Sequence, residues 1–141
     1  MGRRDAPGLT VLLDTHALVW WQAGGRRLSR RAASTIRSAE VLLISPLTGW
    51  EVATLHRLGR LVLDREPSTW VRDLMRSDRM GLAPLTIEAS AWAGMLPATF
   101  PGNPIDRLLY ATARDLRVPL LTKDNRLRAF ACAAGDVEVI W

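Results

Sequence analysis

The chain has 141 residues, a mass of 15.7 kDa, 48% hydrophobic and 23% charged residues, proportions that exclude a disordered chain and fit one domain. Its single cysteine, Cys132, excludes a disulfide framework and a zinc site built on several cysteines. The net charge of +5 favours an acidic partner, of which nucleic acid is the first candidate.

Short apolar runs alternate with helical patterns along the whole chain. In chain order, they predict a strand at 9–13, helices at 15–21 and 30–38, a strand at 41–44, helices at 46–59 and 67–75, a strand at 81–85, helices at 86–95 and 105–116, a strand at 118–121, a helix at 125–130 and a strand at 137–140. Strands that are apolar throughout and separated by helices indicate a parallel sheet covered on both faces. We therefore expect an α/β fold: one three-layer domain at 9–141, with a central parallel sheet of about four to five short strands, preceded by a flexible N-terminal segment at 1–8.

No segment of the sequence suggests targeting or membrane insertion. No apolar run approaches the ~18 residues of a membrane span. Asp14 and His16 interrupt the apolar run nearest the N-terminus, which argues against a signal peptide. We expect a cytoplasmic protein without a membrane partner.

Four acidic residues fall near strand ends or helix starts on one predicted edge of the sheet. Asp14 directly follows the first strand, and Glu51 lies about two turns into the helix after the second strand. Asp106 opens the helix after a Pro-rich loop, and two residues separate Asp124 from strand 118–121. Open parallel sheets bind ligands at the carboxyl ends of their strands, so this edge is the expected site.

Each of these residues also has a structural interpretation, because Asp14 and Asp124 can cap helices and Asp106 can stabilise a helix N-terminus. As a group, however, neighbouring carboxylates repel one another, and protonation or a bound cation relieves the repulsion. A set of oxygen ligands with little His or Cys suits Mg²⁺ or Mn²⁺. Such ions activate water and stabilise charge on a phosphodiester, so the pattern predicts metal-dependent phosphodiester cleavage.

At these positions the sequence resembles the PIN-domain ribonucleases, and within them the VapC-type toxins of bacterial toxin–antitoxin pairs. The matching segments are residues 12–18, 45–52, 103–111 and 121–124. Their order, spacing and placement after strands are together typical of the family, and the similarity extends over about residues 9–141.

The resemblance implies a PIN-like fold and an endoribonuclease that hydrolyses RNA through an acidic quartet. The implied catalytic and metal-binding residues are Asp14, Glu51, Asp106 and Asp124. They would hold one or two Mg²⁺ or Mn²⁺ ions, whose bound water attacks the RNA phosphate, with Thr15 and Thr122 as supporting residues. The resemblance also implies a cognate antitoxin that neutralises the protein, and a homodimer.

Basic and aromatic residues supply candidate contacts to RNA or to a partner. The candidate RNA-binding residues are Arg26, Arg27, Arg30, Arg31 and Arg107. The first four form the densest basic patch, which is equally consistent with a solvated helix face. Among the six tryptophans, Trp20 and Trp50 are candidates to line a groove for an amphipathic partner helix.

Two alternatives to an active nuclease remain open. Many relatives read His-Arg-Asp-Pro before the third acid, whereas this chain has Pro-Gly-Asn-Pro at 101–104, which suits a catalytically weakened or inactive module that binds RNA or protein. Aspartyl-phosphate enzymes also place an aspartate after the first strand. The dehalogenase pattern needs a second aspartate two residues later, where this chain has His16, and the acidic pair of a receiver is absent.

Overall fold

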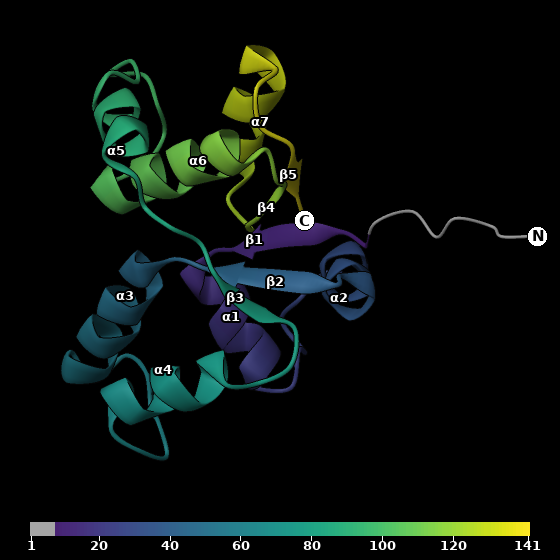
Figure 1. Ribbon diagram of the computed structural model, residues 1–141, viewed down its shortest axis with the longest axis vertical. Helices are drawn as coiled ribbons and strands as arrows, with labels where there is room; N and C mark the ends of the chain where they lie inside the picture. The colour runs from purple at the N-terminus through teal and green to yellow at the C-terminus, as the bar shows by residue number, and fades with distance from the viewer. Residues whose placement is uncertain (1–7) are drawn as a thin grey trace, which may run out of the picture.

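The computed structural model describes residues 8–141, so the expected N-terminal segment at 1–8 lies outside the described residues except for Gly8. Five strands form one parallel sheet in the order β3-β2-β1-β4-β5 (Figure 1). Their bounds are β1 (Thr10–Leu13), β2 (Val41–Ile44), β3 (Met80–Leu82), β4 (Leu120–Leu121) and β5 (Val139–Ile140). The predicted α/β class is confirmed, and the parallel sheet has five strands in the described residues where about four to five were expected.

Seven helices separate or follow the strands at the predicted positions. They are α1 (Thr15–Gln22), α2 (Arg30–Ser38), α3 (Pro46–Arg57), α4 (Pro67–Met75), α5 (Ile87–Gly94), α6 (Pro104–Leu116) and α7 (Asn125–Ala134). Short polar side chains cap several of them, as the sequence predicts: Ser45 Oγ, for example, accepts a hydrogen bond from the Leu47 amide at 3.1 Å, directly before Pro46 at the first helical position.

Strand β4 is shorter, and helix α7 longer, than the sequence predicts. Strand β4 begins only at Leu120, because the amide of Val118 donates to Ala113 in the final turn of α6 and Pro119 has no amide hydrogen. Helix α7 continues four residues past the predicted end and stops where Gly135 takes a φ of 75°, which glycine adopts without steric cost.

Side chains alternate between the two faces of the sheet and build two separate cores. Val11 and Leu13 of β1 face a cluster that includes residues of α1, α2 and α4. Leu12 faces the opposite cluster, which includes residues of α6 and α7. Figure 1 shows this arrangement, with α1 and α4 on one side of the strands and α6 and α7 on the other. The residue-by-residue alternation explains why these strands are apolar throughout.

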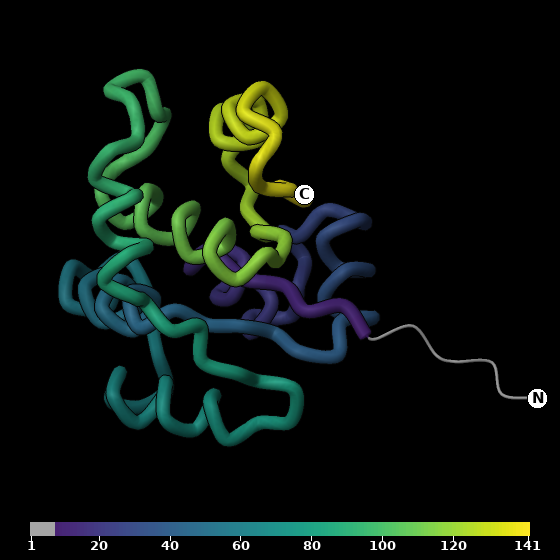
Figure 2. The backbone as a smooth tube through the Cα atoms, turned by 45° about the horizontal axis from the view of Figure 1, so that its top comes forward, coloured from purple at the N-terminus to yellow at the C-terminus, as the bar shows by residue number. Residues whose placement is uncertain are grey.

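The strand order creates a switch point beside β1. From β1 the chain builds β2 and β3 on one side of it, and later adds β4 and β5 on the other. Figure 2 follows this path from the purple first strand to the yellow C-terminus, with β4 between β1 and β5 in the sheet. The crevice between β1 and β4, at the carboxyl ends of the strands, is therefore where such a sheet binds ligands. Within residues 8–141, no helix is long and apolar enough to span a membrane.

Candidate functional site

The four predicted carboxylates line one open pocket of about 490 Å³ at the carboxyl edge of the sheet. The pocket is formed by the ends of β1 and β4 and by the starts of α1, α6 and α7, together with α3. The predicted supporting residues, Thr15 and Thr122, line it as well. Residues more than one hundred positions apart in the sequence are thus brought together at the switch point.

Asp14 begins α1, where β1 ends. Its Oδ1 accepts a hydrogen bond of 2.7 Å from the amide of Ala17, so the residue is the N-cap of the helix. Burial raises the pKa of the Asp14 carboxyl, and the nearby charge of Glu51 raises it further. The Thr122 side chain, the Ala17 amide and the charge of His16 act in the opposite direction without cancelling the effect of burial.

Glu51 reaches the pocket from the second turn of α3 and is held there by a threonine. The Thr15 hydroxyl donates to Glu51 Oε1 at 2.5 Å. Thr48, fully buried one turn before Glu51, places its own Oγ1 3.3 Å from Thr15 Oγ1. Because the Thr15 hydrogen points to the carboxylate, the Thr48 hydroxyl is the donor in this second contact. Thr48 therefore joins α1 to α3 behind the pocket, a role that the sequence analysis did not predict.

Asp106 is fixed by a reciprocal pair of hydrogen bonds at the start of α6. Its Oδ2 accepts from the Asn103 amide at 3.0 Å, while Asn103 Oδ1 accepts from the Asp106 amide at 2.9 Å. Burial is the main cause that raises the pKa of Asp106, and the charge of Asp124 adds to it. A Cβ on Gly102 would lie 2.6 Å from the Asp106 Cβ, so the glycine in this divergent loop allows the loop to pass close to the carboxylate.

Asp124 begins α7 in the same way that Asp14 begins α1. Its Oδ1 accepts hydrogen bonds from the amides of Arg126 at 2.9 Å and Leu127 at 3.2 Å. Asp14 and Asp124 are therefore helix N-caps, and Asp106 stabilises the start of α6, as the structural interpretation expects. These roles do not exclude a role in the pocket. A helix-capping hydrogen bond uses one carboxylate oxygen, and the side chain still lines the pocket.

The donor set suits a hard divalent cation. It consists of carboxylate oxygens, with threonine hydroxyls beside them, and the pKa of both Asp14 and Asp106 is raised in part by a neighbouring acid. Within residues 8–141, however, no three His, Cys, Asp or Glu side chains stand close enough together to ligate one ion. Joint coordination by three of the carboxylates therefore requires side-chain rotation toward the middle of the pocket.

Of the five arginines predicted to contact RNA, only one lines the pocket. Arg27 lines the pocket, whereas Arg26, Arg30 and Arg31 are exposed outside its lining, and Arg31 lies 3.7 Å from Glu138. The Arg107 guanidinium donates instead to backbone carbonyls at the end of α5: to Ala93 at 3.3 Å and Leu96 at 2.8 Å from Nη1, and to Pro97 at 3.0 Å from Nη2. These bonds direct Arg107 toward a helix end, outside the pocket lining.

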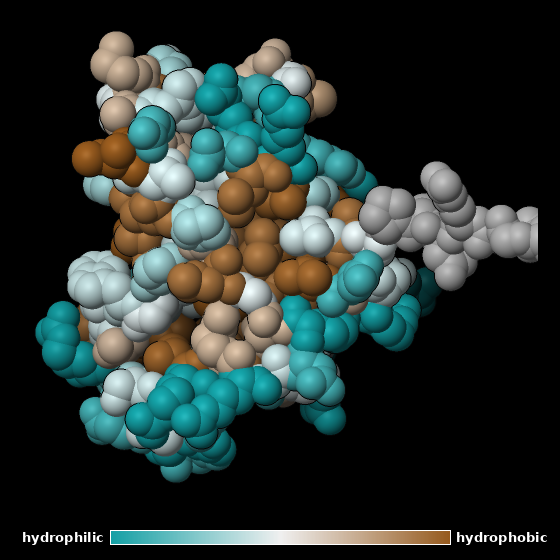
Figure 3. Space-filling model, in the orientation of Figure 1, coloured by the Kyte–Doolittle hydropathy of each residue, from teal (hydrophilic) through white to brown (hydrophobic). Residues whose placement is uncertain are grey.

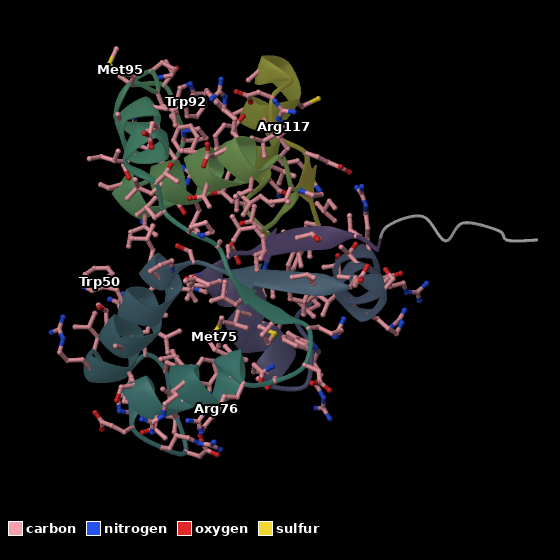
Figure 4. The ribbon with its side chains drawn as sticks, viewed as in Figure 1. Trp50, Met75, Arg76, Trp92, Met95 and Arg117 are labelled. Carbon is pink, nitrogen blue, oxygen red and sulfur yellow. The ribbon has the colours of Figure 1, made fainter. Side chains whose placement is uncertain are left out.

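Sequence reasoning missed one basic residue of the pocket, and of its two candidate groove tryptophans only one lines this pocket. Lys123 lines the pocket directly before Asp124. Its place in the predicted turn between a strand and a helix, beside a predicted site residue, could have identified it. Trp20 also lines the pocket, as one of the two tryptophans expected to border a groove. Trp50 is 60% exposed on the outer side of α3, outside the pocket lining (Figure 4).

The sequence is similar to one family of known proteins. The family model described as PIN domain matches residues 11–132. Ribonuclease VapC22 of Mycobacterium tuberculosis is 40% identical over 121 residues, which cover 85% of this chain and 91% of that protein.

The solved structures with a similar fold include bacterial toxins and toxin–antitoxin complexes. VapBC2 of Rickettsia felis, bound to a DNA fragment from its promoter, has a TM-score of 0.63 at 11% identity and covers 93% of this chain and 97% of that one. VapC20 of M. tuberculosis, a toxin that cleaves the sarcin–ricin loop, has a TM-score of 0.60 at 19% identity, with 92% and 98% covered. A toxin–antitoxin complex from Klebsiella pneumoniae has a TM-score of 0.59 at 18% identity, with 84% and 90% covered. At these identities the structural likeness bears on the fold.

Proposed function

This chain belongs to the PIN-domain family and is a ribonuclease, and from that premise we propose that it is a toxin endoribonuclease that hydrolyses RNA phosphodiesters with Mg²⁺ or Mn²⁺ at the switch-point pocket. The observation that carries the proposal is the convergence of Asp14, Glu51, Asp106 and Asp124 on that pocket. Bound there, the metal would supply charge neutralisation at the phosphate and a water of lowered pKa.

The protein's own residues orient this chemistry. The Thr15 hydroxyl binds Glu51, and Asn103 binds Asp106, so both carboxylates are held at the pocket. Helices α1, α6 and α7 all begin at the pocket, and their N-terminal dipoles offset part of the repulsion between the acids. The same helix ends favour the phosphate of an approaching RNA strand.

A cleavage assay tests the proposal. Purified protein with Mn²⁺ should cut RNA, EDTA should stop the reaction, and Asp14→Asn should lower the rate by about 100-fold or more, because metal charge stabilisation is worth several kcal/mol. Asp78→Asn is the matched control, since Asp78 is exposed and outside the pocket lining. Cleavage that persists in Asp14→Asn would refute the assignment. Absence of cleavage by the wild-type protein would favour the alternative of an inactive binding module.

We further propose a cytoplasmic toxin that is neutralised by a cognate antitoxin and that forms a homodimer. Large apolar side chains are exposed at Trp50, Leu82, Ile87 and Met95. Figure 3 shows hydrophobic residues gathered over the middle of one face, around β3 and the segment that leads to α5. A second, strongly apolar pocket of about 260 Å³ lies between α3, α4 and β3. Apolar surfaces of this kind support a protein partner.

A further inference from the structure

One wall of the switch-point pocket combines an aromatic ring with two cations. The Arg27 guanidinium carbon lies 4.5 Å from the centroid of the Trp20 ring, and Lys123 Nζ lies 5.3 Å from it. All three residues line the same pocket as the four carboxylates. They come from helix α1, from the turn after it and from the turn before α7, so the tertiary structure assembles this cluster.

Trp20 differs from its neighbour Trp21 in what it contacts. Within residues 8–141, Trp21 packs against the hydrophobic core of α1, α2 and α4, and Trp20 does not. Its aromatic neighbours are His16 and Trp141, each with its ring centroid 5.8 Å away, and Trp141 meets it edge-on. The ring is therefore held in orientation at the pocket without serving as core filling.

The charges of the pocket explain why cations are needed at this wall. Four carboxylates repel a polyanion, and Arg27 and Lys123 are the Arg and Lys side chains that line the pocket. Both are exposed, so their contacts with the Trp20 ring are solvated and exchangeable. Both can leave the ring for a phosphate without losing a buried partner, and the half-buried Trp20 ring would then offer a face to a base.

We propose that Trp20, Arg27 and Lys123 form a nucleotide subsite for unpaired RNA: one base stacks on Trp20, and the two cations bind the adjoining phosphates beside the carboxylates. The base must be unpaired because a paired base is already stacked within its own duplex. This subsite deepens the proposed ribonuclease function and rests on it for the identity of the substrate. Trp20 is a positioning residue, which sets which nucleotide lies next to the reacting phosphate.

Binding of a fluorescent RNA in EDTA tests the subsite without any turnover. The probe is a single-stranded oligouridylate of ten nucleotides with a central 2-aminopurine, whose fluorescence is quenched when it stacks on an aromatic ring. Wild-type protein should quench the probe. Trp20→Ala should abolish the quenching and weaken binding about tenfold, within the range for loss of one base–aromatic stack. Trp20→Phe should restore part of both effects, and thermal unfolding confirms that the variants are folded.

Matched controls separate stacking from charge. Trp50→Ala removes an exposed tryptophan outside the pocket and should leave quenching unchanged. Arg27→Ala and Lys123→Ala should each reduce the salt dependence of binding by about 0.7 in log–log slope, as expected for one lost contact to single-stranded phosphate, whereas Arg26→Ala should not.

Three results would overturn the subsite: no binding by wild-type protein, equal quenching by wild type and Trp20→Ala, or equal affinity of wild type for the probe and for an abasic strand of the same length. Because EDTA removes the metal, these outcomes are independent of cleavage. Normal quenching with no nuclease activity would retain the subsite and reject the proposed function. Cleavage without quenching would do the reverse.

Discussion

At the scale of single residues, the carboxylates of the pocket combine local stabilisation with electrostatic cost. Asp14 caps α1, yet burial and the charge of Glu51 raise its pKa. When the pKa of a carboxyl is higher in the folded than in the unfolded protein, the free energy of unfolding falls as the pH rises above the unfolded pKa. The reason is that the unfolded chain then releases the proton more easily than the folded protein does. The cost is therefore present at neutral pH and disappears below about 3.8, the ordinary pKa of this group.

Asp14→Asn should consequently stabilise the protein while it removes activity. Asparagine still accepts the hydrogen bond from the Ala17 amide and is an equally good N-cap. We expect a gain of about 1 kcal/mol in the free energy of unfolding at pH 7, of the size seen when a strained functional site is relieved. Urea unfolding at a series of pH values measures it, and the gain should shrink as pH falls toward 3.8. A gain that grows with acidity would contradict the argument.

At the scale of secondary-structure elements, Arg107 ties the beginning of α6 to the end of α5. Its guanidinium donates to the carbonyls of Ala93, Leu96 and Pro97, at and just beyond the end of α5. The carbonyls of Ala93 and Pro97 also accept hydrogen bonds from backbone amides. It also lies 5.5 Å from the ring of Phe100, which is buried. The adjacent Asp106 therefore depends on this contact for the position of its helix.

Arg107→Ala should destabilise the fold by about 2 kcal/mol, the scale of hydrogen bonds made by a charged group. Thermal or urea unfolding provides the measurement, and Arg26→Ala is the control because it removes an equal charge from an exposed position. If Arg107→Ala left stability unchanged but weakened RNA binding, its side chain would act on RNA, as the sequence first suggested.

At the scale of the whole molecule, the sheet order determines where the acids meet. Metal bound only by the folded pocket should stabilise the entire protein, by about 2.7 kcal/mol at a hundredfold excess over Kd. Mn²⁺ should therefore raise the Tm of wild type and of Asp78→Asn, but not that of the double variant Asp14→Asn, Asp106→Asn. Differential scanning fluorimetry reports the shift. An equal response of the double variant would locate the metal elsewhere on the protein.

The sequence determined the elements because their signals are local. Apolar runs and caps such as Ser45-Pro46 predicted every strand and helix of the described chain. They also predicted that Asp14, Asp106 and Asp124 lie after a strand or at a helix start, and that Glu51 lies within a helix. The predicted start of β4 was wrong for a reason that is also local. The amide of Val118 donates a hydrogen bond to the last turn of α6 and is not available to the sheet. The length of a strand depends on which partner its amides find.

Only the tertiary structure decided which side chains share the pocket. Arg107 and Lys123 each adjoin an acid in sequence, yet Arg107 turns to a helix end and Lys123 to the Trp20 ring. Thr48 likewise acquires its partner from another helix, Thr15 on α1. Periodicity and capping report hydrogen bonds within a few residues, whereas these contacts depend on how the parallel strands are ordered and where their carboxyl ends meet.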